Sequence, residues 1–231
     1  MIGTTLILLS QLITLGLWWA AKEQYPASGW DNAGAQITGL LGMMSLCISF
    51  VLSIRTRWIE RVFGGLDVVY KIHHIVGGLS LVFLINHVLL LIVAGLPRDT
   101  ILLYLWPGTS LAYTLGQVAL YLMLFLIVLT LYVELPYRYW KWSHEWMGLV
   151  IILGGLHSML ITSDTSRYMP LRYWIMGWAV VATVAFLYKR FGYYYFPRPT
   201  KYCVVRAGRD HALFVMSLET TDRAIKFEGG Q

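Results

Sequence analysis

Long apolar runs, separated by short polar stretches, fill the chain up to about residue 190. Six of these runs are long enough, or nearly so, to cross a bilayer, which takes about 20 residues of helix. The predicted membrane helices cover residues 3–21, 33–54, 72–95, 113–134, 145–163 and 171–190. This pattern predicts an all-α membrane protein built as a bundle of six transmembrane helices.

The pattern changes after the sixth run. Three short segments there read as β-strands joined by polar turns, at residues 202–208, 211–220 and 224–231. A sheet of two or three strands is marginal alone, so these strands are expected to need further chain or a partner. We therefore expect a membrane domain at residues 1–191 and a short, incomplete β segment at residues 192–231.

Composition and charge agree with a membrane location. The chain is 58% hydrophobic and only 13% charged, about half the charged share of soluble domains. The net charge of +6 is read as cytoplasmic loop charge, because lysine and arginine concentrate in the loops after the second, fourth and sixth runs. This predicts a lipid bilayer as partner, no nucleic-acid partner, and both termini in the cytoplasm. Short loops without a glycosylation motif favour a bacterial inner membrane.

Five of the six histidines lie in the third and fifth runs or at their inner ends: His73, His74, His87, His144 and His157. Imidazoles are costly in hydrocarbon, so a histidine inside a membrane is a functional candidate by default. The predicted orientation makes these two helices parallel. Their first histidines therefore lie level near the inner face, and their second histidines lie level nearer the outer face.

Helical phase distinguishes His73 from His74. At about 100° per residue, fourteen positions return to within about 40° of the starting face, whereas thirteen miss it by about 140°. His73 and His87 are fourteen residues apart, so we expect these two to share a face.

The fifth helix has the less favourable spacing. His144 and His157 are thirteen residues apart, and Gly154 and Gly155 precede the second histidine. We expect a π-bulge or kink at these glycines that brings both histidines to one face.

Two histidine pairs at matching depths indicate two metal centres stacked across the bilayer, most simply hemes. Fourteen residues at about 1.5 Å each separate the centres by about 21 Å, and axial histidine is an established heme ligand. Gly77 and Gly148 each lie four residues after the first histidine of their helix. A macrocycle could pack on bare backbone there, or the glycines could serve helix packing.

Membrane histidines have two other common uses. Histidines can form interhelical hydrogen bonds without any cofactor. Zinc or copper sites place their ligands within a few ångström of one another, which the spacing along the helix opposes.

Heme propionates need cationic partners. The candidates are Arg55, Arg57 and His74 at the inner end, and Arg98 and Arg167 at the outer end. Each candidate also has a simpler explanation. The arginines could be ordinary loop charge, and His74 could be a surface or interfacial residue.

On these motifs the whole chain resembles the ferric-reductase-like transmembrane family, which includes NADPH oxidases and ferric-chelate reductases. Its members characteristically use the spacings His-x13-His and His-x12-His to hold two b-type hemes, each between two histidines. The resemblance implies that His73 and His144 ligate the inner iron and that His87 and His157 ligate the outer iron. The family commonly has a basic residue after the first ligand, the place of His74, which also favours His73.

The resemblance also implies partners and a reaction. Residues 227–231 resemble the opening of the FAD-binding β-barrel of ferredoxin-reductase-type dehydrogenases. A cytosolic dehydrogenase domain with FAD and NAD(P)H, in this chain or a partner, would then supply electrons. The two hemes would pass them to a small acceptor outside, either oxygen, giving superoxide, or a ferric chelate. Leu91 occupies a place where superoxide-generating members often carry a further histidine. Without that dehydrogenase domain, residues 1–231 are expected to lack NAD(P)H-oxidising activity.

Two alternatives remain at this point. A quinone-linked heme membrane subunit that feeds a periplasmic reductase shares the six-helix scaffold, although such subunits normally end soon after the sixth helix. A transporter or structural membrane protein without cofactor would be colourless.

Overall fold

The computed structural model describes residues 2–25, 32–95, 104–192, 202–210 and 213–220. The chain divides into two compact units, Met1–Lys189 and Arg190–Gln231. The first is helical, and the second contains a β-hairpin. This division falls two residues before the boundary expected from the sequence.

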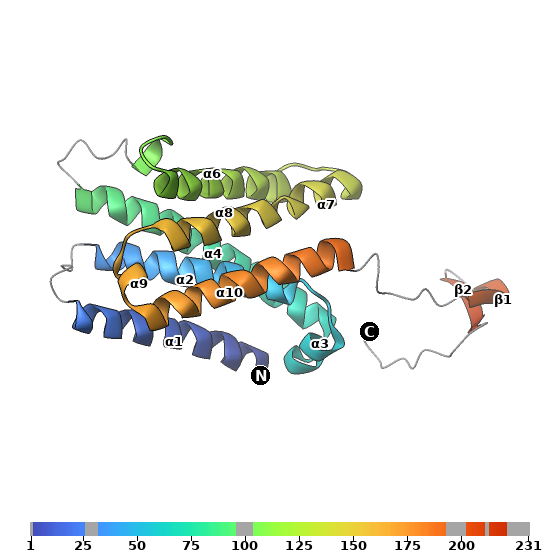
Figure 1. Ribbon diagram of the computed structural model, residues 1–231. Helices are drawn as coiled ribbons and strands as arrows, with labels where there is room; N and C mark the ends of the chain where they lie inside the picture. Colours follow the sequence, from blue (N-terminus) through green and yellow to red (C-terminus); the bar gives the residue numbers. More distant parts are fainter. Residues whose placement is uncertain (1, 26–31, 96–103, 193–201, 211–212, 221–231) are drawn as a thin grey trace. The chain divides into compact units, whose positions relative to one another are not determined.

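Five helices in the described part are long and apolar enough to cross a membrane. They are α1 (Ile2–Gln24), α2 (Ala33–Leu52), α4 (Leu66–Gly95), α6 (Leu111–Tyr132) and α10 (Met169–Leu187), which continues as a π-helix, Tyr188–Gly192. Figure 1 shows these helices running alongside one another, with the short helices α3 (Arg57–Phe63) and α9 (Asp164–Arg167) near their ends. The prediction of a helical, multi-span membrane unit is confirmed.

The predicted fifth membrane helix is broken. It consists of α7 (Tyr137–Glu145) and α8 (Met147–Leu160), separated by Trp146 with φ −67° and ψ −11°. Alone, α8 has 14 residues, fewer than a bilayer crossing needs. The sixth crossing therefore stays a prediction.

The irregularity lies at Trp146 and not at Gly154 and Gly155, where α8 is continuous α-helix. Trp146 N–H donates to the Ser143 carbonyl at 3.1 Å, and Leu149 N–H donates to the Trp146 carbonyl at 2.9 Å. Both bonds span three residues, as in a 3₁₀ turn, which rotates the chain by about 120° per residue instead of 100°. This extra rotation reduces the mismatch of the thirteen-residue spacing. The π-bulge or kink expected at the glycines was wrong in place, and the irregularity found is a 3₁₀ turn at Trp146.

Helix α4 begins at Leu66, earlier than the apolar run predicts. Gly64, with φ +87°, ends α3, and Asp67 lies in the first turn of α4, where an acidic side chain stabilises a helix N-terminus. His73 consequently lies inside the helix and not at its end.

Helix α2 is the centre of the helical unit. It packs on α4, α10 and α1, and its buried side chains include Met44, Cys47 and Ile48. Gly42 allows α4 to approach closely, because a Cβ there would lie 2.8 Å from Leu84 Cδ2. Helix α6 instead packs along α8. In the described part of the chain, α4 and α8, which bear three of the four candidate ligands, do not pack extensively on each other.

The second unit contains one antiparallel hairpin, β1 (Tyr202–Asp210) and β2 (Leu213–Thr220), with a bulge between Val204 and Arg206. The polar turn predicted directly after residue 208 is wrong in position, since Arg209 and Asp210 pair with Phe214 and Leu213 and extend β1. The predicted third strand, residues 224–231, lies outside the described residues.

Candidate metal centres

His73 on α4 and His144 on α7 lie together. Their ring centres are 6.3 Å apart and their planes are inclined at 77°. Imidazoles bound to opposite sides of one metal ion have ring centres about 6 Å apart, given metal–nitrogen bonds of about 2 Å. We call these two residues the inner site. Its separation and ring orientation fit two axial ligands of a single iron.

His73 is anchored to α2. Its Nδ1 lies 3.0 Å from the Ser49 carbonyl oxygen and 3.0 Å from the Ser49 hydroxyl. An Nδ1–H that donates to the carbonyl fixes the tautomer and leaves Nε2 with a free lone pair. This is the outer-shell contact that orients metal-binding histidines and raises their basicity.

His87 and His157, the outer site, are anchored in the same way. His87 Nδ1 lies 2.7 Å from the Ala35 carbonyl oxygen on α2, and His157 Nδ1 lies 2.7 Å from the Ala112 carbonyl oxygen on α6. His87 also interacts electrostatically with His157. Both rings are thus held with Nε2 available.

A glycine one turn after each acceptor makes these contacts sterically accessible. A Cβ at Gly39 would lie 2.8 Å from His87 Nδ1, and a Cβ at Gly116 would lie 2.7 Å from His157 Nδ1. Distances below 3.0 Å are essentially never found for real Cβ atoms. Only glycine at these two positions allows the imidazoles to lie against the helix backbone.

His144 differs from the other three. Its Nδ1 is buried and has no hydrogen-bond partner. Its ring instead stacks on Trp140 of the same helix, with centres 5.6 Å apart and planes 2° from parallel.

The donor set fits heme better than a protein-only metal site. No group of three or more histidine, cysteine, aspartate or glutamate side chains that could hold a metal is present among the residues with described positions. Paired imidazoles, with the macrocycle supplying the remaining ligands, match axial heme ligation. His73 with His144, and His87 with His157, are the residues that would hold two such groups.

Among the propionate candidates with described positions, His74 lies beside the inner site. His74 is exposed, and its ring centre is 5.9 Å from that of His73. Arg55 lies over the ring of Tyr70, with its guanidinium carbon 5.0 Å from the ring centre. Arg57 is an exposed residue of α3.

Of the two outer candidates, Arg167 has a described position. Arg167 is on α9, where its carbonyl accepts a hydrogen bond from Tyr25 Oη at 3.3 Å. Arg98 lies outside the described residues. Contacts of all five candidates with propionates stay predictions.

Lys189 also lies near the inner site, although the sequence marks it only as part of the positive charge after the sixth apolar run. Lys189 interacts electrostatically with both histidines of the inner site and with Arg55, Glu145 and Lys141. Lys189 lies at the end of the last long helix on the predicted cytoplasmic side, and Lys141 lies on that side near the start of the fifth. That shared position was the sequence signal that could have placed Lys189 near the inner site.

The two glycines considered for macrocycle packing have different surroundings. A Cβ at Gly148 would overlap the Phe186 ring, so Phe186 of α10 fills this notch and the helix-packing alternative holds there. A Cβ at Gly77 would meet Ser49 Oγ at 3.5 Å, an ordinary contact.

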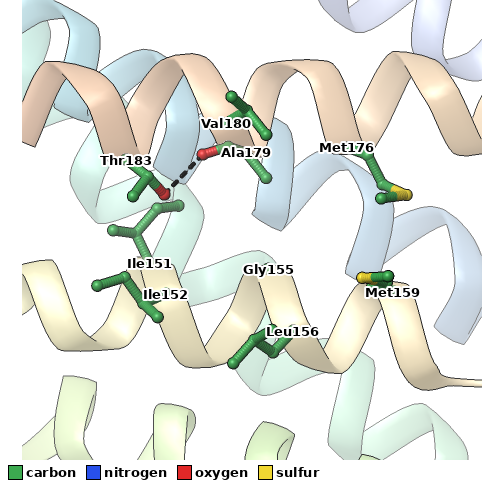
Figure 2. Close-up of a pocket in the computed structure, with 9 residues that line it drawn as sticks. All are labelled: Ile151, Ile152, Gly155, Leu156, Met159, Met176, Ala179, Val180 and Thr183. Carbon is green, nitrogen blue, oxygen red and sulfur yellow. Dashed lines mark hydrogen bonds between the residues drawn. The ribbon is translucent and has the colours of Figure 1, made fainter.

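A separate apolar groove of about 180 Å³ lies between α8 and α10. Figure 2 shows its lining, in which Thr183 bears the polar side chain. The Thr183 hydroxyl donates to the Ala179 carbonyl at 2.8 Å, so it is already satisfied. The groove offers no group for catalysis.

Comparison with known proteins identifies the family. Residues 38–155 match the family described as ferric reductase like transmembrane component, and this match covers more than half of the 231-residue chain. The chain therefore belongs to this family and is an integral, multi-pass membrane protein of oxidoreductase type. The matched region contains His73, His87 and His144, and it ends two residues before His157. No curated protein matches the chain.

Proposed function

We propose that this chain carries electrons across a membrane through two b-type hemes, one held by His73 and His144 and one by His87 and His157. Membership of the ferric reductase family supports transmembrane electron transfer as the general activity. The proposal rests above all on one observation. Three of the four imidazoles are anchored through Nδ1 to a backbone carbonyl, and the fourth lies 6.3 Å from its partner ring.

Each bound heme would supply a one-electron carrier. The chain's own residues would do the rest. The carbonyls of Ser49, Ala35 and Ala112 hold the ring protons at Nδ1, so that Nε2 points away from the anchoring helix. The apolar helix surfaces around the sites exclude water, which keeps the imidazoles neutral and able to bind iron.

The remaining parts follow from the predicted orientation. Helices α7 and α8 together would form the sixth crossing, both termini would be cytoplasmic, and the bilayer would be a bacterial inner membrane. Electrons would come from a dehydrogenase domain with FAD and NAD(P)H. The acceptor outside would be oxygen, giving superoxide, or a ferric chelate. The hairpin from Tyr202 to Thr220 favours this scheme over a quinone-linked subunit that ends after the last helix.

A vesicle experiment tests this function. The purified chain is placed in liposomes that enclose ferricyanide, and dithionite is added outside. We expect ferricyanide to be reduced faster than in protein-free vesicles, and the protein to show a reduced b-type spectrum. Equal rates with and without protein, or a protein without a Soret band, would contradict the proposal.

A further inference from the structure

His144 stands out among the four candidate ligands because its Nδ1 has no hydrogen-bond partner in the part of the chain that the structure describes. The other three rings each have a carbonyl oxygen within 3.0 Å of Nδ1, whereas Nδ1 of His144 is buried without a partner. A buried polar atom without a partner is uncommon in folded proteins and calls for an explanation. An imidazole without an anchor would also rotate more freely about its side-chain bonds.

A tryptophan takes the place of the missing anchor. Trp140 precedes His144 by four residues, so both side chains lie on the same face of α7. Their rings are 2° from parallel with centres 5.6 Å apart. Trp140 also stacks on Tyr137, with centres 5.8 Å apart. The indole is therefore held on its own helix, and its flat face restricts the imidazole to one plane.

The helix that carries His144 differs from those that carry the other three ligands. Helix α7 ends at Glu145 and the chain tightens at Trp146, so His144 lies in the last turn of a nine-residue helix. His73 and His87 instead lie within the 30-residue helix α4, which packs along α2, and His157 lies on α8, which packs along α6; these three rings reach carbonyls of the neighbouring helices. The short helix α7 supplies its own support from one turn earlier.

We propose that Trp140 is the positioning residue of His144, and that it does by stacking what a backbone carbonyl does for each other ligand. This inference rests on the proposed heme function. A stacked ring keeps its plane but gains no basicity through Nδ1, so the bond from His144 is the weakest of the four. The inner site is consequently the one at which an axial ligand is first displaced by a small neutral ligand such as carbon monoxide.

The test compares three variants of the full chain in detergent. Trp140→Ala removes the stacking surface, and Trp140→Phe keeps a flat ring. Trp142→Ala is the matched control, because Trp142 is on the same helix, is 60% exposed and contacts Trp146 edge-on. Heme content, low-spin electron paramagnetic resonance signals and the carbon monoxide difference spectrum of the reduced protein are measured. The outer heme serves as an internal check of folding.

We expect Trp140→Ala to retain the inner heme about 10–100-fold more weakly, the usual effect of losing an outer-shell contact. What remains of that heme should bind carbon monoxide, while the outer heme stays low-spin and unreactive. Trp140→Phe and Trp142→Ala should resemble the unsubstituted chain. Two unaltered low-spin hemes in Trp140→Ala, or equal losses in Trp140→Ala and Trp142→Ala, would overturn the inference alone. An unsubstituted chain without heme would overturn the proposed function as well.

Discussion

The glycines beside the outer site allow the sharpest test of how the ligands are held. Replacing Gly39 by alanine places a Cβ 2.8 Å from His87 Nδ1, and ordinary van der Waals contact begins at 3.4 Å. The imidazole would have to retreat by about 0.6 Å, which would stretch its 2.7 Å contact with the Ala35 carbonyl beyond the usual hydrogen-bond range of about 2.7–3.2 Å. Gly116→Ala would do the same to His157, where the Cβ would lie 2.7 Å from Nδ1.

The expected cost is the loss of one anchoring hydrogen bond. Such bonds contribute about 0.5–1.5 kcal/mol net, and a buried donor left unsatisfied costs about 1–3 kcal/mol. Lost outer-shell contacts typically weaken metal binding about 10–100-fold, or about 1.4–2.8 kcal/mol. Each alanine variant should therefore lose the outer heme about 10–100-fold more readily and keep the inner one.

Gly177→Ala is the matched control. Gly177 is exposed on α10, and nothing lies within 4 Å of the Cβ it would gain. Alanine favours helix over glycine by about 1 kcal/mol, so this change should leave both hemes in place. The assay is transfer of heme to an excess of a heme-accepting protein, followed by absorbance. If Gly39→Ala and Gly116→Ala lost heme no faster than Gly177→Ala, the reasoning about backbone anchoring would be refuted.

Three further predictions concern the inner half of the bundle. His73→Ala should lose the inner heme while His74→Ala keeps both, since the His74 ring is exposed; heme content per chain decides this, and the reverse result would exchange the two roles. Phe186→Ala should empty the notch at Gly148 and destabilise the chain by about 3 kcal/mol, read as a lower midpoint of thermal unfolding; an unchanged midpoint would argue against this packing. Lys189→Gln removes a positive charge near the inner site. The reduction potential of the inner heme should therefore fall, and the fall should be smaller at high salt. Lys189→Arg is the control, and an unchanged potential in Lys189→Gln would show that the lysine is too far from the heme to affect it.

The apolar runs predicted the long helices because a membrane helix can be recognised from the length and hydropathy of its sequence alone. The starts of α4 and α7 were missed for the same reason. Asp67 and Lys71 interrupt the apolar pattern in α4, and the segment Tyr137–Glu145 is aromatic and charged. Both stretches are helical all the same, so hydropathy marks the apolar part of each helix and not its ends.

The break at Trp146 could not be predicted from local signals. Glycine pairs are the usual marks of an irregular helix, and the sequence offers Gly154 and Gly155. No glycine or proline adjoins Trp146, where the helix is irregular, and α8 is continuous through Gly154 and Gly155. The spacing of His144 and His157 indicated an irregularity between them, but it did not say where the irregularity occurs.

The histidines of the candidate site could be chosen from spacing, but their anchors could not. Helical phase favoured His73 over His74, and the structure brings the His73 ring to within 6.3 Å of His144. The acceptors are backbone carbonyls on other helices, which no side-chain pattern reveals. Trp140 is different, because its four-residue spacing from His144 was visible in the sequence.

The most direct test of the central claim is which histidines lose a heme together. Single alanine variants of His73, His144, His87 and His157 are purified, and the remaining heme is identified by its reduction potential and low-spin signal. We predict that His73→Ala and His144→Ala lose one and the same heme, and that His87→Ala and His157→Ala lose the other. Any other pairing, or an unsubstituted chain that binds no heme, would contradict the account.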